Sequence, residues 1–156
     1  MPHRKTLSDL INPGKLISLP GDAAAALAAR KMMECQVGAV VVQSGGKLLG
    51  IVTERDINFR VVAIGRDPTT TSLADIMTKN PKTMPPETPV VEALNLMQKN
   101  GYRHVPVVEE GKVIAIVSLR DIFMEVRRSL EQDIQDSDEF IVSAGGTDPG
   151  PDGTTH

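Results

Sequence analysis

The chain repeats itself at a spacing of 65 residues, and this duplication limits the possible folds more than any other feature. Residues 18–61 align with residues 83–126 without a gap. Of these 44 pairs 13 are identical, whereas chance gives about three. The densest match aligns Gly46–Ile57 with Gly111–Ile122. The period is too long for a solenoid, so the sequence predicts two small domains packed face to face.

Each copy predicts the same order of elements: a short strand, a helix, two strands and a second helix. The β-branched run Gly38–Gln43 predicts a buried strand, and Ser44-Gly45-Gly46 predicts the hairpin turn that follows it. The second copy predicts the same hairpin over Val105–Val117. The extended pieces Leu16–Leu19 and Lys82–Met84 are expected to open the two copies.

Helix boundaries follow from spacing and capping residues. The first helix is predicted from Asp22 or Ala23 to about Glu34. In the second copy Thr88 is predicted as N-cap, with Pro89 at the first helical position. The predicted core-facing positions of the first helix are Ala26, Leu27, Ala29, the stem of Arg30, and Met33.

Composition excludes several classes of protein. The 156 residues include one cysteine, Cys35, so neither an internal disulfide nor a Cys-rich zinc site is possible. The longest apolar run, Ala23–Ala29, is too short to span a membrane, and no signal-peptide pattern is present, which predicts a cytoplasmic protein. Residues 1–128 carry a formal charge of +4 and residues 129–156 a charge of −7. This balance favours a small anionic ligand over DNA, although a solvated acidic tail of no special function also explains it.

The sharpest local motif is Gly50-Ile-Val-Thr53-Glu-Arg55-Asp56, which returns as Ala115-Ile-Val-Ser118-Leu-Arg120-Asp121. In both copies a hydroxyl residue stands where a strand gives way to a helix, and an Asp follows one turn later. A helix N-terminus and a hydroxyl suit a phosphate, and a carboxylate suits the two hydroxyls of a ribose. The same pattern is also a capping box, in which the two side chains only satisfy free backbone amides.

Residues 7–128 resemble a tandem pair of CBS domains, also called a Bateman module. The resemblance rests on the duplicated motif, on the Ala-x-x-x-Met spacing of Ala28/Met32 and Ala93/Met97, and on Gly101-Tyr-Arg-His-Val-Pro-Val107. It implies an α/β (α+β) fold of two βαββα repeats related by a pseudo-two-fold axis. We therefore expect one repeat over 7–66, a linker over 67–72, a second repeat over 73–128 and an acidic tail over 129–156.

The resemblance also implies a ligand. CBS pairs most often sense adenine nucleotides such as AMP, ADP, ATP, NAD or S-adenosylmethionine, bound as regulatory ligands between the repeats; no obligatory cofactor and no metal are implied. Thr53 and Ser118 would contact phosphate or ribose, and Asp56 and Asp121 would hold the ribose hydroxyls. The other implied contacts are Ile17, Ser18, Leu19, Ala39, Val40, Arg55, Lys82, Thr83, Met84, Arg103, His104, Val105, Pro106 and Arg120.

Three functions are consistent with the sequence. The first is a non-enzymatic nucleotide sensor that passes the signal to a homodimer or to an effector protein. The alternative is a structural dimerisation module that needs no ligand. The third is an enzyme, which is disfavoured because no nucleophile with an adjacent base, metal cluster or pair of catalytic carboxylates is recognisable. No binding to DNA and no membrane insertion are expected.

The sequence also predicts the roles of several individual residues. His104 is interpreted as a phosphate contact or pH-sensitive group, with a packed core histidine as an equal alternative. Ala115 in place of Gly50 is expected to crowd a ligand in the second copy. Cys35 is expected to be a half-buried thiol. Residues 131–140 are expected to form a polar extension of the last helix or a tether for a partner, with disorder toward the end of the chain. Core packing is expected of Met32, Met33, Met77, Met84 and Met97.

Overall fold

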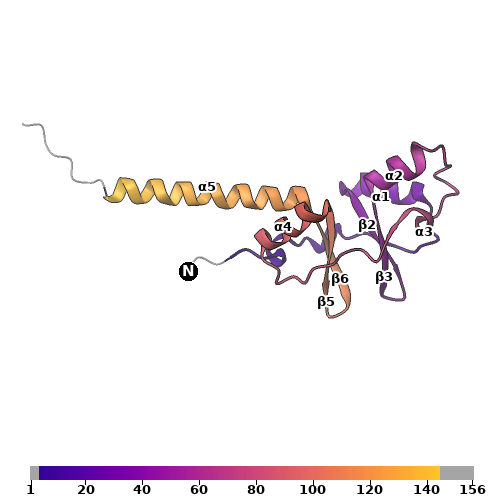
Figure 1. Ribbon diagram of the computed structural model, residues 1–156, viewed down its shortest axis with the longest axis horizontal. Helices are drawn as coiled ribbons and strands as arrows, with labels where there is room; N and C mark the ends of the chain where they lie inside the picture. The colour runs from indigo at the N-terminus through magenta and orange to yellow at the C-terminus, as the bar shows by residue number, and fades with distance from the viewer. Residues whose placement is uncertain (1–3, 145–156) are drawn as a thin grey trace, which may run out of the picture.

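The computed structural model describes residues 4–144, with side chains described as far as residue 138. Two units of strands and helices lie side by side, and the last helix projects from them (Figure 1). This mixed α/β architecture with two sheets confirms the predicted fold class. The predicted disorder toward the end of the chain concerns residues 145–156, which lie outside the described residues.

The order of elements agrees with the prediction in the first repeat, and in the second apart from its opening strand. The first repeat contains two 3₁₀ turns, η1 (Leu7–Leu10) and η2 (Pro13–Lys15), then β1 (Ser18–Leu19), α1 (Ala25–Cys35), β2 (Ala39–Ser44), β3 (Lys47–Thr53), α2 (Glu54–Ile57) and a π-helical turn η3 (Asn58–Val62). The second contains α3 (Leu73–Ile76), β4 (Thr78–Lys79), α4 (Val90–Asn100), β5 (His104–Glu109), β6 (Lys112–Ser118) and α5 (Leu119–Ala144). The short strand predicted at Lys82–Met84 is reduced to one bridge between Met84 and Val107.

Both hairpins form at the predicted turns. Gly45 and Gly46 have φ values of 56° and 79°, and Glu110 and Gly111 have 50° and 77°. Two successive left-handed residues make the tight turn whose twist suits antiparallel strands. β2 therefore pairs with β3, and β5 with β6.

The lead-in segments of the two repeats are exchanged. Leu7 of η1 is 1% exposed and belongs to the core of the second repeat, together with Met97 and Ile122. Conversely, Leu73 and Ile76 of α3 are fully buried in the core of the first repeat. The core of the second repeat therefore needs the segment that opens the first repeat, and the core of the first repeat needs the segment that opens the second. The two repeats thus stabilise one another.

A strand that was not predicted completes the first sheet. β4 pairs antiparallel with β3, giving the order β1-β2-β3-β4, while β5 and β6 form a sheet of two. Gly50 allows this approach, because a Cβ there would lie 2.6 Å from Met77 Sδ and 2.7 Å from the Thr78 carbonyl oxygen. The expectation that Ala115 crowds a ligand is wrong. Ala115 is 2% exposed in the second core, and the missing Cβ of Gly50 makes room for β4.

Replacing Gly50 with alanine is expected to lower the free energy of unfolding by about 1–3 kcal/mol. The new methyl group would overlap a backbone carbonyl, so β4 must move away from β3. Urea unfolding measures the change, and Ala115→Gly at the aligned position is the control, with an expected loss of about 1 kcal/mol. An unchanged midpoint for Gly50→Ala would contradict the pairing of β3 with β4.

Two helix predictions are corrected by the structure. The buried positions of α1 are Ala25, Ala28 and Met32, whereas Met33, predicted to face the core, is 71% exposed. Alanine occurs all around this helix, so its apolar pattern does not fix which side faces the sheet. α4 begins at Val90 with Pro89 as N-cap. Thr88 is not the cap, because its hydroxyl donates to the Pro85 carbonyl oxygen at 2.8 Å, within the preceding turn.

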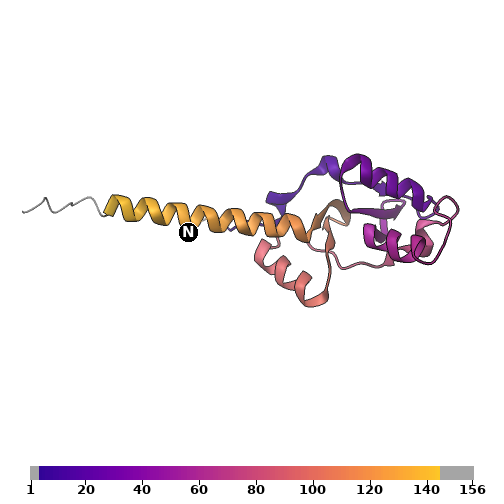
Figure 2. The same cartoon turned by 90° about the horizontal axis from the view of Figure 1, so that it is seen from above.

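The helix α5 is 26 residues long, which confirms that residues beyond 131 extend it. Its second half projects from the body in both views (Figures 1 and 2). Cys35, the last residue of α1, is a half-buried free thiol, as predicted. Within residues 4–144 no helix is both long and apolar enough to cross a membrane.

Candidate ligand-binding site

The Thr53–Asp56 pair caps the helix α2. Asp56 Oδ2 accepts from the Thr53 backbone N–H at 2.9 Å, and Thr53 Oγ1 accepts from the Asp56 N–H at 3.2 Å. Ser118 and Asp121 repeat these contacts at the start of α5, at 3.1 and 3.0 Å. The predicted capping contacts are thus present in both copies. Asp56 Oδ2 also accepts from the Thr53 hydroxyl at 3.2 Å, so Oδ1 is the Asp56 oxygen that has room for a ligand hydroxyl.

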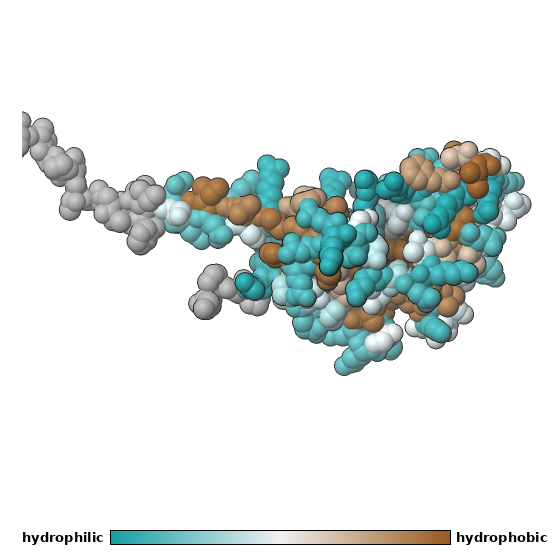
Figure 3. Space-filling model, viewed as in Figure 1, coloured by the Kyte–Doolittle hydropathy of each residue, from teal (hydrophilic) through white to brown (hydrophobic). Residues whose placement is uncertain are grey.

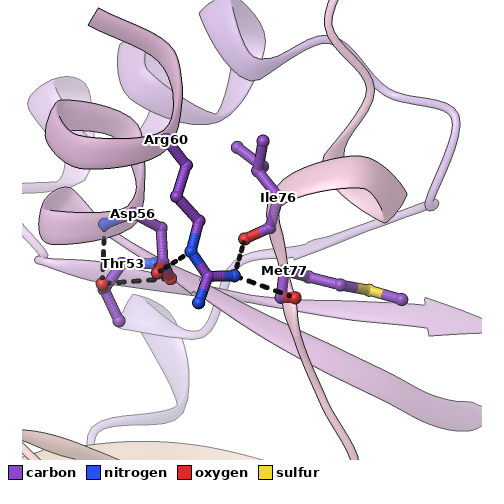
Figure 4. Close-up of polar contacts among 5 residues, drawn as sticks. All are labelled: Thr53, Asp56, Arg60, Ile76 and Met77. Atoms are coloured by element: carbon purple, nitrogen blue, oxygen red, sulfur yellow. Dashed lines mark hydrogen bonds and ion pairs between the residues drawn. The ribbon is translucent and has the colours of Figure 1, made fainter. Parts of the chain in front are cut away.

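Arg60 distinguishes the first copy from the second. Its Nε lies 3.7 Å from Asp56 Oδ1, and one terminal nitrogen donates to the Ile76 carbonyl oxygen at 2.9 Å (Figure 4). The Asp56 side chain is only 13% exposed. Arg60 therefore joins the start of α2 to the chain that leads into β4, and it holds Asp56 in a fixed orientation.

A cleft of about 420 Å³ lies in front of this pair, between the two repeats. This volume falls within the range of small-molecule sites. One side is formed by the end of β3 and the start of α2, the second by the segment that follows β4, and the third by the loop between α4 and β5. We call it the inter-repeat cleft; its lining residues are Ile51, Thr53, Glu54, Arg55, Asp56, Thr78, Lys79, Asn80, Pro81, Lys82, Gly101, Tyr102, Arg103 and His104.

The inter-repeat cleft has an excess of positive charge. Four cationic side chains, Arg55, Lys79, Lys82 and Arg103, outnumber the carboxylates of Glu54 and Asp56 among its lining residues. These cations come from three separate segments of the chain. An anionic ligand of nucleotide size matches both the volume and the charge.

The second copy of the motif opens onto a different surface. Ser118 and Arg120 line a groove of about 510 Å³ with Arg103 and His104 at one end and Phe123 and Arg127 along α5. Asp121 is not among its lining residues. We call this surface the α5 groove. Gly38 of the first repeat aligns with Arg103 of the second, and the two pockets differ in their lining residues.

His104 lies where the repeats meet. A Cβ added to Gly38 would come within 3.0 Å of His104 Nε2 and 3.2 Å of Glu54 Oε1, so glycine makes room for the imidazole there. His104 Nδ1 is buried without a hydrogen-bond partner among the residues described. Burial lowers the pKa of His104, and the carboxylates of Glu54, Asp121 and Asp56 oppose this effect. The imidazole is therefore a packed group that also faces the cleft.

The duplicated fold and this cleft coincide with a known domain family. The family model for the CBS domain matches residues 7–62 and again residues 73–128. The chain belongs to the CBS-domain family. It is a tandem CBS pair with the regulatory type of architecture, as the resemblance implied.

Relatives and solved structures agree with this assignment. A mitochondrial CBS domain-containing protein of Arabidopsis thaliana, CBSX3, is 36% identical over 119 residues, covering 73% of this chain and 58% of its own length. The CBS domain protein PAE2072 from Pyrobaculum aerophilum, solved in complex with AMP, is 28% identical with a TM-score of 0.68, and the match covers 80% of this chain and 99% of that one. A hexameric CBS-CP12 protein from bloom-forming cyanobacteria is 25% identical with a TM-score of 0.73, covering 95% and 88%. The chain therefore spans only part of the length of the Arabidopsis relative. The name of that relative places it in mitochondria. For this chain the cytoplasmic location stays a prediction.

The predicted site residues of the CBS pair fall into three groups. Thr53, Arg55, Asp56, Lys82, Arg103 and His104 meet in the inter-repeat cleft, and Ser118 and Arg120 line the α5 groove. The remaining ones line neither surface, and as ligand contacts they stay predictions: Ile17, Ser18, Leu19, Ala39, Val40, Thr83, Met84, Val105, Pro106 and Asp121.

Strand pairing already occupies part of this last group. The Met84 N–H donates to the Pro106 carbonyl oxygen at 3.1 Å, and the Met84 carbonyl oxygen accepts from the Val108 N–H at 3.0 Å. Those backbone groups are engaged in the sheet. Sequence reasoning missed Lys79 and Tyr102, because their part in the cleft depends on β4 and on the contact between repeats.

The lowered pKa of His104 predicts a pH dependence of stability. The folded protein holds the imidazole neutral, so the unfolded chain binds more protons as the pH falls below about 6.5. Stability is therefore expected to decrease from pH 7 to pH 5.5. Urea unfolding at both values should show a smaller decrease for His104→Gln than for the unchanged chain. Equal decreases in the two proteins would contradict the assignment of this effect to His104.

Proposed function

We propose that this CBS pair senses adenine nucleotides in the inter-repeat cleft and transmits binding to a second copy or to an effector protein. The observation that carries the proposal is the cleft itself, where the Thr53–Asp56 pair faces four cationic side chains. The carboxylate suits ribose hydroxyls, and the cations suit phosphate. A similar CBS protein has been solved with AMP, which supports the same ligand class here.

The experiment is a thermal-shift panel with AMP, ADP, ATP, NAD and S-adenosylmethionine, each with and without magnesium. A nucleotide at about 100 times its dissociation constant adds about 2.7 kcal/mol of stability, which raises the midpoint by about 5–10 °C. Adenosine is the matched control because it lacks the phosphate that the cations would bind. No shift with any nucleotide would contradict the proposal.

A ligand-independent dimerisation module is the second candidate. Two observations favour it: both hydroxyl–carboxylate pairs are engaged in helix caps, and apolar side chains are exposed on the helices of both repeats. Met33 and Val62 are 71% and 64% exposed around one groove, and Met124 is 60% exposed along the α5 groove. A stable homodimer with no nucleotide response would establish this candidate.

A further inference from the structure

The projecting part of α5 is exposed along all of its residues whose side chains the structure describes. Residues 131–138 are all exposed, and Leu130 and Ile134 are 57% and 61% exposed. Figure 3 shows apolar side chains, drawn in brown, on this part of the helix. Short helices are marginal alone in water because most of their stability comes from packing an apolar face. This half of α5 therefore has a face that remains to be covered.

One face of α5 carries an ordered series of side chains. Successive members are three or four residues apart, so they lie above one another on the same side of the helix. In its first half two basic residues flank one apolar residue; two apolar residues follow, and an acidic residue ends the series. We call it the α5 seam: Arg120, Phe123, Arg127, Leu130, Ile134 and Asp138.

We propose that two copies of this chain pair through their α5 seams in antiparallel orientation. This arrangement places Arg120 of each copy against Asp138 of the other, and Phe123 against Ile134. A parallel pair would instead place Arg120 against Arg120 and Asp138 against Asp138. Opposite charges across an interface select the orientation, and like charges disfavour the alternative.

The charge of the whole region supports a second copy as the partner. Residues 129–144 contain five acidic residues and neither Lys nor Arg. The α5 groove, by contrast, presents Arg103, Arg120 and Arg127 beside the apolar side chains of Phe123 and Met124. An acidic helix with apolar side chains is the complement of that groove, and the chain itself supplies one. The inference deepens the second-copy part of the proposed function and does not require nucleotide binding.

The first test is a charge-reversal cycle on the full chain without nucleotide, measured by sedimentation velocity over a range of concentrations. Arg120→Glu and Asp138→Arg should each raise the dimer dissociation constant about tenfold. The double variant should restore it, because the two charges are then exchanged and opposite charges face one another again. Arg120→Glu places a favourable charge in the first turn of α5, so a weaker helix would not explain the loss in that variant.

The second test reads the orientation directly. A spin label on Ser137→Cys, in a Cys35→Ser background, should lie about 25 Å from its counterpart in an antiparallel pair centred near residue 129, given the helical rise per residue. A parallel pair would bring the labels to about 10 Å. A monomeric chain, labels at about 10 Å, labels far beyond 25 Å, or single reversals that leave the dimer unchanged would each overturn the proposal. Because no nucleotide is present, a failed ligand panel and a failed dimer are separate results.

Discussion

Asparagine in place of Asp56 is expected to weaken adenine-nucleotide binding about 10–100-fold, the usual cost of losing hydrogen bonds to a charged group. The side-chain oxygen of asparagine still accepts from the Thr53 N–H, so the cap of α2 is largely retained. What disappears is the negative charge and the second acceptor oxygen, on which a ribose would depend. Isothermal titration with the nucleotide that gives the largest thermal shift measures the change.

The repeat provides the matched control for this prediction. Asp121→Asn alters the same cap at the same place in the second copy, but Asp121 does not line the inter-repeat cleft. We expect its nucleotide affinity to stay within about twofold of the unchanged chain, while both variants lose similar stability. Equal affinities for the two variants and the unchanged chain would show that Asp56 serves only as a cap.

Replacing Leu7 with alanine is expected to lower the free energy of unfolding by about 2–5 kcal/mol, because Leu7 is 1% exposed and its removal leaves a cavity. The loss of packing should appear in the second repeat, because Leu7 belongs to its core. It should not appear in the first repeat, although that repeat directly follows Leu7 in the chain. Hydrogen exchange measures where the structure loosens. Faster exchange is expected in α4, β5 and β6.

Leu73→Ala is the reciprocal control. Leu73 begins α3 as Leu7 begins η1, and it is fully buried in the first core. Its loss should be of similar size, with faster exchange in α1, β2 and β3. If each substitution instead loosened the repeat that follows it in the chain, the exchange of lead-in segments would be wrong.

Much of the candidate site could be predicted from local signals. The Thr53–Asp56 and Ser118–Asp121 pairs form the caps that their spacing predicts. Arg103 and His104 reach the cleft, as the family resemblance implied. Spacing alone could not show that Asp56 lines the cleft whereas Asp121 does not, because this difference depends on how the repeats meet.

The sequence by itself determined the duplication, because aligning the chain with itself is enough to reveal it. It also determined the two hairpins and the caps at Thr53–Asp56 and Ser118–Asp121, because each depends on residues within a few positions of one another. Only the tertiary structure decided which side of α1 is buried, that β4 joins the first sheet, and that Leu7 and Leu73 exchange cores. It also gathered Arg55, Lys79 and Arg103 into one cleft. These outcomes depend on contacts between distant segments, where packing and the fit of backbone against backbone select one arrangement among several that the same local pattern allows.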